Sequence, residues 1–392
     1  MKLSNRITGI LGDGSDGWEV FLKARAMIKD GIDVTELTIG EHDIRTAAPI
    51  LQHMHKTALG GHTGYAAVPG TDELRETVAK RVQAQSGVPT RPENVMITPG
   101  GQAALFAAHV AVCDAGDTAM YLDPFYATYP GTVRGAGAVP LAIQTRSEDA
   151  FQPRASDIEA HAVGAKSLLI NSPNNPTGTV YSRATLEGIA DVCKRHDLWL
   201  ISDEVYDTQV WEGEHLSPRA LPDMAERTLV VGSMSKSHAM TGSRVGWVVG
   251  PEAVVESLTN LATHTTYGVP GFIQDASTFA LNQGPAFEEE IAAPFKRRRE
   301  IAREIIARQN TVGLIPAQGA MYLMLDLRAT GMTGEAFANA MLDAQHIAVM
   351  PGESFGVAAA GHVRVAMTIE DSAFAAAIET LCAFAEGLAK NA

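Results

Sequence analysis

Short apolar runs alternate with helical patterns through the middle of the chain. Seven runs are predicted to be strands: residues 95–98, 118–122, 139–143, 167–171, 198–202, 228–231 and 245–249. Each is brief and mostly apolar, as expected for strands that are buried on both faces. Helical stretches between them, such as residues 103–113 and 184–195, are long enough to cross over a sheet. The pattern therefore predicts an α/β fold, with a parallel sheet covered by helices.

The pattern changes after about residue 270, where long helices replace most of the strands. Two further strands are predicted, at residues 321–326 and 362–367. We expect a large domain over residues 46–280 and a smaller α+β domain formed by residues 1–45 together with 281–392. Within the smaller domain, residues 286–310 place Glu288 to Glu290 ahead of Lys296 to Arg299. This order suits a helix dipole and predicts a solvated helix rather than a binding patch.

Charge and composition exclude several classes of partner. The 31 Lys and Arg against 45 Asp and Glu give a net charge of −14, which repels nucleic acids and anionic membranes. We take residues 103–112 as the longest apolar stretch, and it is far shorter than the roughly 20 residues of a membrane helix. The first residues lack the features of a secretory signal, so we expect a cytoplasmic protein. Three widely separated cysteines indicate neither disulfides nor a metal site.

A serine-rich turn with a lysine follows one of the predicted strands. It reads Ser233-Met234-Ser235-Lys236, and Arg244 comes eight residues after the lysine. A nearby cation and a desolvated site lower the pKa of a lysine and make its amine nucleophilic. Arg244 and the two serine hydroxyls could also hold a phosphate. Taken alone, however, a lysine in such a turn is more often a surface residue.

Three more strand ends carry polar residues. Asp203, Glu204 and Tyr206 close the run at 198–202, where open α/β sheets bind ligands, and a buried carboxylate there could pair with a protonated ring nitrogen. A loop rich in turn formers, residues 171–178, contains Asn175. The sequence Thr98-Pro99-Gly100-Gly101-Gln102 precedes an Ala-rich helix, whose first backbone N–H groups could bind a phosphate. Each motif alone is a polar strand end or a tight turn, but together they predict one ligand crevice.

These motifs resemble those of a known enzyme family. Residues 233–246 are similar to the lysine-attachment signature of class I/II aminotransferases, the pyridoxal 5′-phosphate (PLP) enzymes of fold type I, and the other motifs follow in the family's order. The resemblance covers nearly the whole chain. It implies a PLP-dependent transferase fold with a mostly parallel large-domain sheet and a smaller α+β domain. It also implies an aminotransferase that moves an amino group between an L-amino acid and a 2-oxo acid by a ping-pong mechanism.

The resemblance assigns roles to the residues that touch the cofactor. Lys236 would form the Schiff base and carry the proton, and Asp203 would pair with the pyridinium nitrogen. Tyr206 and Asn175 would bond the cofactor 3′-oxygen. The phosphate would be held by Gly101, Gln102, Ser233, Ser235 and Arg244.

Further roles concern the ring face, the substrate and a second subunit. Tyr126 matches the aromatic position stacked on the cofactor ring, although the adjacent Phe125 is an alternative. Arg364 would bind the substrate α-carboxylate with two parallel hydrogen bonds. Tyr65 matches a tyrosine that reaches the phosphate of the neighbouring subunit, which implies a homodimer.

The subgroup is less clearly indicated. Residues 196–206 and 235–242 resemble bacterial arginine–pyruvate transaminases and, more broadly, the aspartate aminotransferase-like group. The loop Gly40-Glu41-His42-Asp43-Ile44-Arg45, with Gly40 expected near the substrate, departs from the Pro and Phe that relatives usually have. Gln102 stands where the aspartate and prephenate subgroup places a lysine. Both departures argue against assigning to this chain the substrate of either group of relatives.

Three alternatives stay open. A PLP-dependent carbon–sulfur β-lyase would share the same cofactor motifs, and the fold does not separate it from a transaminase. The sequence GxGxxG at residues 12–17, with a strand at 7–11 in front and a helix at 18–29 behind, is a possible nicotinamide dinucleotide fingerprint of a dehydrogenase. A PLP-binding regulator without turnover would carry a DNA-binding domain ahead of this fold.

Overall fold

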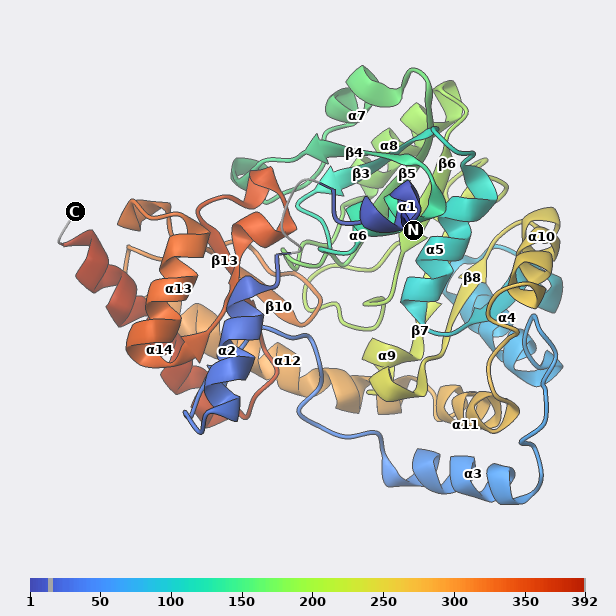
Figure 1. The fold of residues 1–392 in the computed structure, drawn as a ribbon, viewed down its shortest axis with the longest axis horizontal. Helices are drawn as coiled ribbons and strands as arrows, with labels where there is room; N and C mark the ends of the chain where they lie inside the picture. Colours follow the sequence, from blue (N-terminus) through green and yellow to red (C-terminus); the bar gives the residue numbers. More distant parts are fainter. Residues whose placement is uncertain (13–16, 391–392) are drawn as a thin grey trace.

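The chain folds around a seven-stranded sheet, shown in Figure 1. A computed structural model describes residues 1–12 and 17–390. The strand order is β2-β8-β7-β6-β5-β3-β4. The strands are β2 Val95–Thr98, β3 Thr118–Asp123, β4 Val139–Gln144, β5 Ala165–Asn171, β6 Trp199–Asp203, β7 Thr228–Ser233 and β8 Gly246–Val249. All seven predicted strands are confirmed, but β8 runs antiparallel to both of its neighbours, so the sheet is mostly parallel.

Helices cover both faces of this sheet because successive strand residues point to opposite sides. Ile201 and Val231 pack with one group of helices: α5 Gly101–Val112, α6 Tyr129–Ala136 and α10 Glu252–Thr263. Leu200 and Val230 face the other side, which is covered by α4 Asp72–Ser86, α7 Ala155–Ala162, α8 Arg183–Arg195 and α11 Gly271–Leu281. A short helix, α9 Met234–Ser237, follows β7 directly, and α3 Ala48–Leu59 lies beside α11 at the edge of the molecule (Figure 1).

A second, antiparallel sheet lies in the C-terminal part of the chain. Its order is β12-β13-β10-β9, with β9 Gly313–Leu314, β10 Tyr322–Asp326, β12 Met350–Pro351 and β13 His362–Ala366. The two strands predicted here are confirmed. A parallel pair joins β1 Thr35–Glu36 to β11 Ile347–Ala348, so the N-terminal segment associates with this smaller unit. The domain boundaries at residues 45 and 280 agree with this layout and stay a prediction.

The smaller unit is packed by α2 Glu19–Lys29, α12 Pro285–Ile306, α13 Gly334–Gln345 and α14 Asp371–Ala389. The expectation that α12 is a solvated helix is wrong for one of its faces. Glu288, Arg298 and Arg299 are all buried, at 8%, 3% and 4% exposure. Glu288 accepts a hydrogen bond from Arg81 on α4, and Arg298 forms ion pairs with Asp43 and Asp371. The helix therefore ties the two units together through charged side chains.

The expectation that residues 103–112 form the longest apolar stretch is also wrong. Within the described residues, α14 alone has the length and composition of a membrane span. Its Phe374, Ile378 and Leu381 are fully buried in the core of the smaller unit, where α14 packs against α12. The apolar side chains of α14 thus have a packing role.

Candidate active site

A cavity of about 350 Å³ opens at the carboxyl ends of the large-sheet strands. It collects residues from all four predicted strand ends: Gly101 and Gln102 after β2, Asn171 and Asn175 at β5, Asp203 and Tyr206 at β6, and Ser233, Ser235 and Lys236 at β7. Arg244, which precedes β8, lines it as well. Parallel strands place their carboxyl ends on one edge of a sheet, so residues far apart in the sequence meet there.

The smaller unit closes the other side of this cavity. Tyr322 comes from β10 and Arg364 from β13, while Gly40 and Glu41 come from the loop after β1. Glycine is required at position 40 because a Cβ atom there would overlap the Tyr322 hydroxyl. The site is therefore built between the two sheets.

Asp203 is a buried carboxylate that forms no ion pair with any described residue. Its side chain is only 4% exposed. One oxygen accepts from the Tyr129 hydroxyl at 2.7 Å and the other from the Val205 backbone N–H at 3.3 Å. Burial raises the pKa of Asp203 to about 6, although both hydrogen bonds oppose this shift. The carboxylate is thus ionised at neutral pH and suited to a cationic ligand.

Arg364 is the opposite case, a buried cation without a carboxylate partner among the described residues. It is 1% exposed. It donates to the Asn175 side-chain oxygen at 2.9 Å and to the Thr38 carbonyl. Its guanidinium carbon lies 4.4 Å from the centroids of both the Tyr322 and Phe355 rings, so two aromatic rings contact the cation. Burial lowers its pKa, yet an arginine keeps its charge.

Lys236 lies on the short helix α9 and points into the cavity wall. The Ser233 side chain caps this helix by accepting from the Ser235 backbone N–H at 3.1 Å. The Lys236 amine donates to the Gly40 carbonyl, and its own carbonyl accepts from Gln209 at 3.3 Å. The lysine is thus held at both its main chain and its amine.

Hydrogen-bond donors gather where α5 begins. Gly100 has φ +83°, and a Cβ atom there would overlap the Arg244 guanidinium, so only glycine lets this turn approach the arginine. Arg244 donates to the Thr241 carbonyl at 2.9 Å. Backbone N–H groups at the start of α5, the hydroxyls of Ser233 and Ser235, and Arg244 therefore face one part of the cavity.

Two phenols meet at the floor of the cavity. The hydroxyls of Tyr206 and Tyr322 lie 3.1 Å apart, and the Asn175 amide donates to Tyr206 at 3.5 Å. Burial raises the pKa of Tyr206 well above its ordinary value, and the neighbouring Tyr322 acts in the same direction. Tyr206 is therefore a neutral hydrogen-bond donor.

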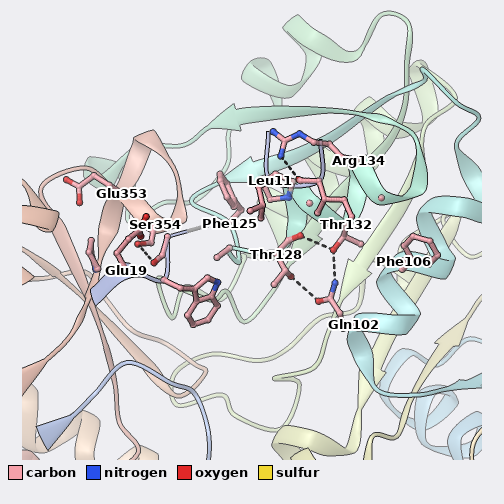
Figure 2. Close-up of a pocket in the computed structure, with 18 of the residues that line it drawn as sticks. Leu11, Glu19, Gln102, Phe106, Phe125, Thr128, Thr132, Arg134, Glu353 and Ser354 are labelled. Atoms are coloured by element: carbon pink, nitrogen blue, oxygen red, sulfur yellow. Dashed lines mark hydrogen bonds between the residues drawn. The ribbon is translucent and has the colours of Figure 1, made fainter. Parts of the chain in front are cut away.

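Not every predicted residue reaches this cavity in the expected way. The Gln102 amide donates to Thr132 at 2.6 Å and accepts from Thr128 at 2.9 Å, so its polar end is already occupied (Figure 2). Tyr65 is 91% exposed, packs edge-on against Tyr267 and lines no cavity described here. Tyr126 lines the smaller cavity.

A larger cavity of about 1110 Å³ adjoins the first one. Figure 2 shows it between α5 and α6 on one side and Ser354 and Glu353 of the smaller unit on the other. Trp18, Gln102 and Arg244 line both cavities, and Phe125 lines only the larger one. Together the two cavities offer room for a ligand that extends outward from Lys236.

Sequence reasoning missed Tyr129, Tyr322 and Trp18. Tyr129 begins α6 three residues after Tyr126, in a turn that brings the two ring centroids within 5.9 Å, and this short spacing could have revealed it. Tyr322 had no such signal, because its place depends on the pairing of β10 with β13. Trp18 was noted only as the start of a helix.

The chain was also compared with known proteins. The model of the family "Aminotransferase class I and II" matches residues 32–381. Arginine–pyruvate transaminase AruH of Pseudomonas aeruginosa is 40% identical over 94% of both chains, and the aspartate/prephenate aminotransferase of Thermus thermophilus is 35% identical over 91% of this chain and 92% of its own. Among solved structures, T. thermophilus aspartate aminotransferase with maleate has a TM-score of 0.91 at 33% identity, covering 98% of this chain and 99% of that one.

The uncompensated charge of Arg364 leads to a stability prediction. Replacing Arg364 by Met removes a buried cation that has no anionic partner, so the ligand-free protein should melt at the same temperature as wild type or higher. Arg298→Met is the matched control. It removes the ion pair of Asp43 and one of the two ion pairs of Asp371, which keeps Arg297, and should cost about 1 to 3 kcal/mol. Thermal melts that show equal losses in the two variants would contradict the unpaired state of Arg364.

Proposed function

This chain belongs to the aminotransferase class I and II family, and from that membership we propose its amino donor and the roles of its site residues. The enzyme is PLP-dependent and transfers an amino group between an amino acid and a 2-oxo acid. We propose that the donor is an L-amino acid with a positively charged side chain, with arginine as the first candidate. The observation that carries this proposal is the carboxylate of Glu41 in the cavity wall.

The residues of the cavity fit PLP. Asp203 offers a buried anion for a protonated ring nitrogen. The start of α5, the two serines and Arg244 offer donors for a phosphate, and the phenol of Tyr206 with the amide of Asn175 offers donors for the 3′-oxygen. Tyr126, rather than Phe125, is proposed to cover the ring because it lines the same cavity.

The reaction needs a base, an electron sink and a group that binds the substrate carboxylate. PLP supplies the electron sink when it is bound. Lys236 is proposed to hold the cofactor and then, with its amine free, to move a proton between the donor α-carbon and the cofactor C4′. Arg364 is proposed to bind the donor carboxylate through the N–H groups of its guanidinium, which Asn175 orients. The lyase and dehydrogenase alternatives gain no support, and residues 5–8 form helix α1, Asn5–Thr8, where the dinucleotide hypothesis needed a strand.

The charges around the cavity favour a donor without a second carboxylate. Lys236, Arg244 and Arg364 are the basic side chains that line the smaller cavity, and each already has a proposed partner. Gln102 is neutral and its amide is engaged by two threonines. A distal carboxylate would thus meet no dedicated cation among these described residues.

Glu41 has the properties needed to bind a distal cation. It lines the smaller cavity, and among the described residues its carboxylate accepts a hydrogen bond only from the Thr241 hydroxyl, at 3.1 Å. No Lys or Arg side chain in the described part of the chain forms an ion pair with it. A guanidinium group binds a carboxylate with good geometry, and the name of the relative AruH also points to arginine.

The donor can be identified from the absorbance of the bound cofactor. We expect arginine to bleach the yellow enzyme faster than aspartate, and pyruvate to restore the colour. Glu41→Gln should lower kcat/KM for arginine about tenfold to a hundredfold, as for a lost charged hydrogen bond, and leave alanine unaffected. Glu256→Gln on α10, outside both cavities, is the control. Faster bleaching by aspartate, or release of pyruvate and ammonia without bleaching, would reject the proposal.

Asp203→Asn tests the pairing with the cofactor ring. The amide keeps the shape of the carboxylate but not its charge, so PLP should still bind and colour the protein while kcat falls about a hundredfold or more. Asp207→Asn is a control on the same segment, because Asp207 is paired with Arg81 outside the cavity. Near-normal turnover in Asp203→Asn would contradict the proposed role.

We also propose a homodimer in the cytoplasm. Leu59 at the end of α3 and Tyr65 after it are exposed, and Tyr65 lines neither of the two cavities described above. In a dimer, Tyr65 would reach the phosphate held by the neighbouring subunit. Sedimentation should give twice the 41.6 kDa chain mass, and Tyr65→Phe should weaken PLP binding. A monomer that binds PLP and turns over normally would rule the dimer out.

A further inference from the structure

His42 occupies an unusual position in the loop between β1 and α3. Its ring packs edge-on against Phe295 of α12, with the ring centroids 5.2 Å apart and an interplanar angle of 71°. Phe295 itself is fully buried in the core of the smaller unit. The imidazole is therefore fixed on one side by a rigid aromatic wall.

Both ring nitrogens of His42 are shielded from solvent, and neither makes a hydrogen bond of ordinary geometry within the described residues. Burial lowers the pKa of His42 to about 4, and the positive charge of Lys236 acts in the same direction. The Lys236 carbonyl lies close enough to oppose that shift. The ring is thus neutral near pH 7, with one N–H that has the Lys236 main chain as its neighbour. Leaving a buried polar group without a firm partner is costly.

The loop that carries His42 is fastened on both sides of it. Before it, the Gly40 carbonyl accepts from the Lys236 amine. After it, Asp43 receives two hydrogen bonds from Arg298, at 3.1 and 2.6 Å, and Thr46 donates to the Ala239 carbonyl at 2.6 Å. His42 therefore sits between two anchors, and its ring faces the segment that carries Lys236.

We propose that His42 is a positioning residue for Lys236. Its ring, packed on Phe295 in a loop that is fastened to the Lys236 segment through Gly40 and Thr46, directs an N–H toward the Lys236 carbonyl. This fixes both the main chain from which the lysine side chain extends and the Gly40 carbonyl that receives the amine. The inference rests on the proposed role of Lys236 as the cofactor lysine.

A comparison of two variants separates positioning from packing. His42→Leu keeps an apolar side chain against Phe295 but has no donor, whereas His42→Gln keeps an N–H of similar reach. In His42→Leu we expect kcat to fall about tenfold and the apparent Kd for PLP to rise about tenfold, because a misplaced Lys236 amine both holds PLP and transfers a proton less well. The KM for the donor should not change, because Arg364 is untouched. His42→Gln should recover most of both losses.

Thermal melts of the PLP-free proteins complete the test. We expect His42→Leu to melt no lower than wild type, since it removes a buried polar group with no firm partner. His109→Leu is the matched control. Both nitrogens of His109 are unpartnered among the described residues, as those of His42 are, and burial lowers its pKa to about 4. His109 is fully buried within α5 and lies outside both cavities. This control should leave kcat and PLP affinity unchanged.

Two results would overturn the inference. One is unchanged kcat and PLP affinity in His42→Leu. The other is equal loss in the Leu and Gln variants together with a lower melting temperature, which would mean packing alone. Failure of the wild-type protein to bind PLP on Lys236, seen by peptide mapping after borohydride reduction, would instead reject the proposed function.

Discussion

Burial of charge without a neutralising partner is the constraint on which this site depends. Asp203 and Arg364 are both almost fully buried, and neither forms an ion pair among the described residues. Such burial costs several kcal/mol per charge. The fold lowers this cost with neutral donors and acceptors, chiefly Tyr129 for the aspartate and Asn175 for the arginine. The cavity thus remains ready for a ligand with a cation at one end and an anion at the other.

The two charges come from different sheets, so the site forms only when the two sheets pack against each other. Asp203 ends β6 of the large sheet, whereas Arg364 lies in β13 of the small one. The hydrogen bond between Tyr206 and Tyr322 joins the same two units at the floor of the cavity. Outside the cavity, the buried Arg298 of α12 forms an ion pair with Asp43, in the loop whose Gly40 carbonyl accepts from the Lys236 amine. A site shared in this way makes the relative position of the units a condition for activity.

The large sheet and the reacting residues were predictable from the sequence for a common physical reason. Buried parallel strands appear as continuous apolar runs, and ligand-binding residues follow directly after them, as Asp203 follows the run at 198–202. The antiparallel direction of β8 was not predictable, because a strand buried on both faces has the same pattern in either direction. Tyr322 and the burial of Arg298 were also missed, since both depend on contacts between distant segments.

The cavity residues proposed to lie near the donor side chain also depend on contacts between distant segments. Trp18 precedes α2, Glu41 lies in the loop after β1, and Gln102 begins α5, so three separate segments meet at one end of the cavity. None of their positions is set by the period of a strand. The Gln102 amide shows the consequence: its side chain satisfies two threonines and leaves only its backbone to the cavity. The residues at the strand ends can therefore keep the same reaction within this fold, while changes in the surrounding segments alter which amino donor binds.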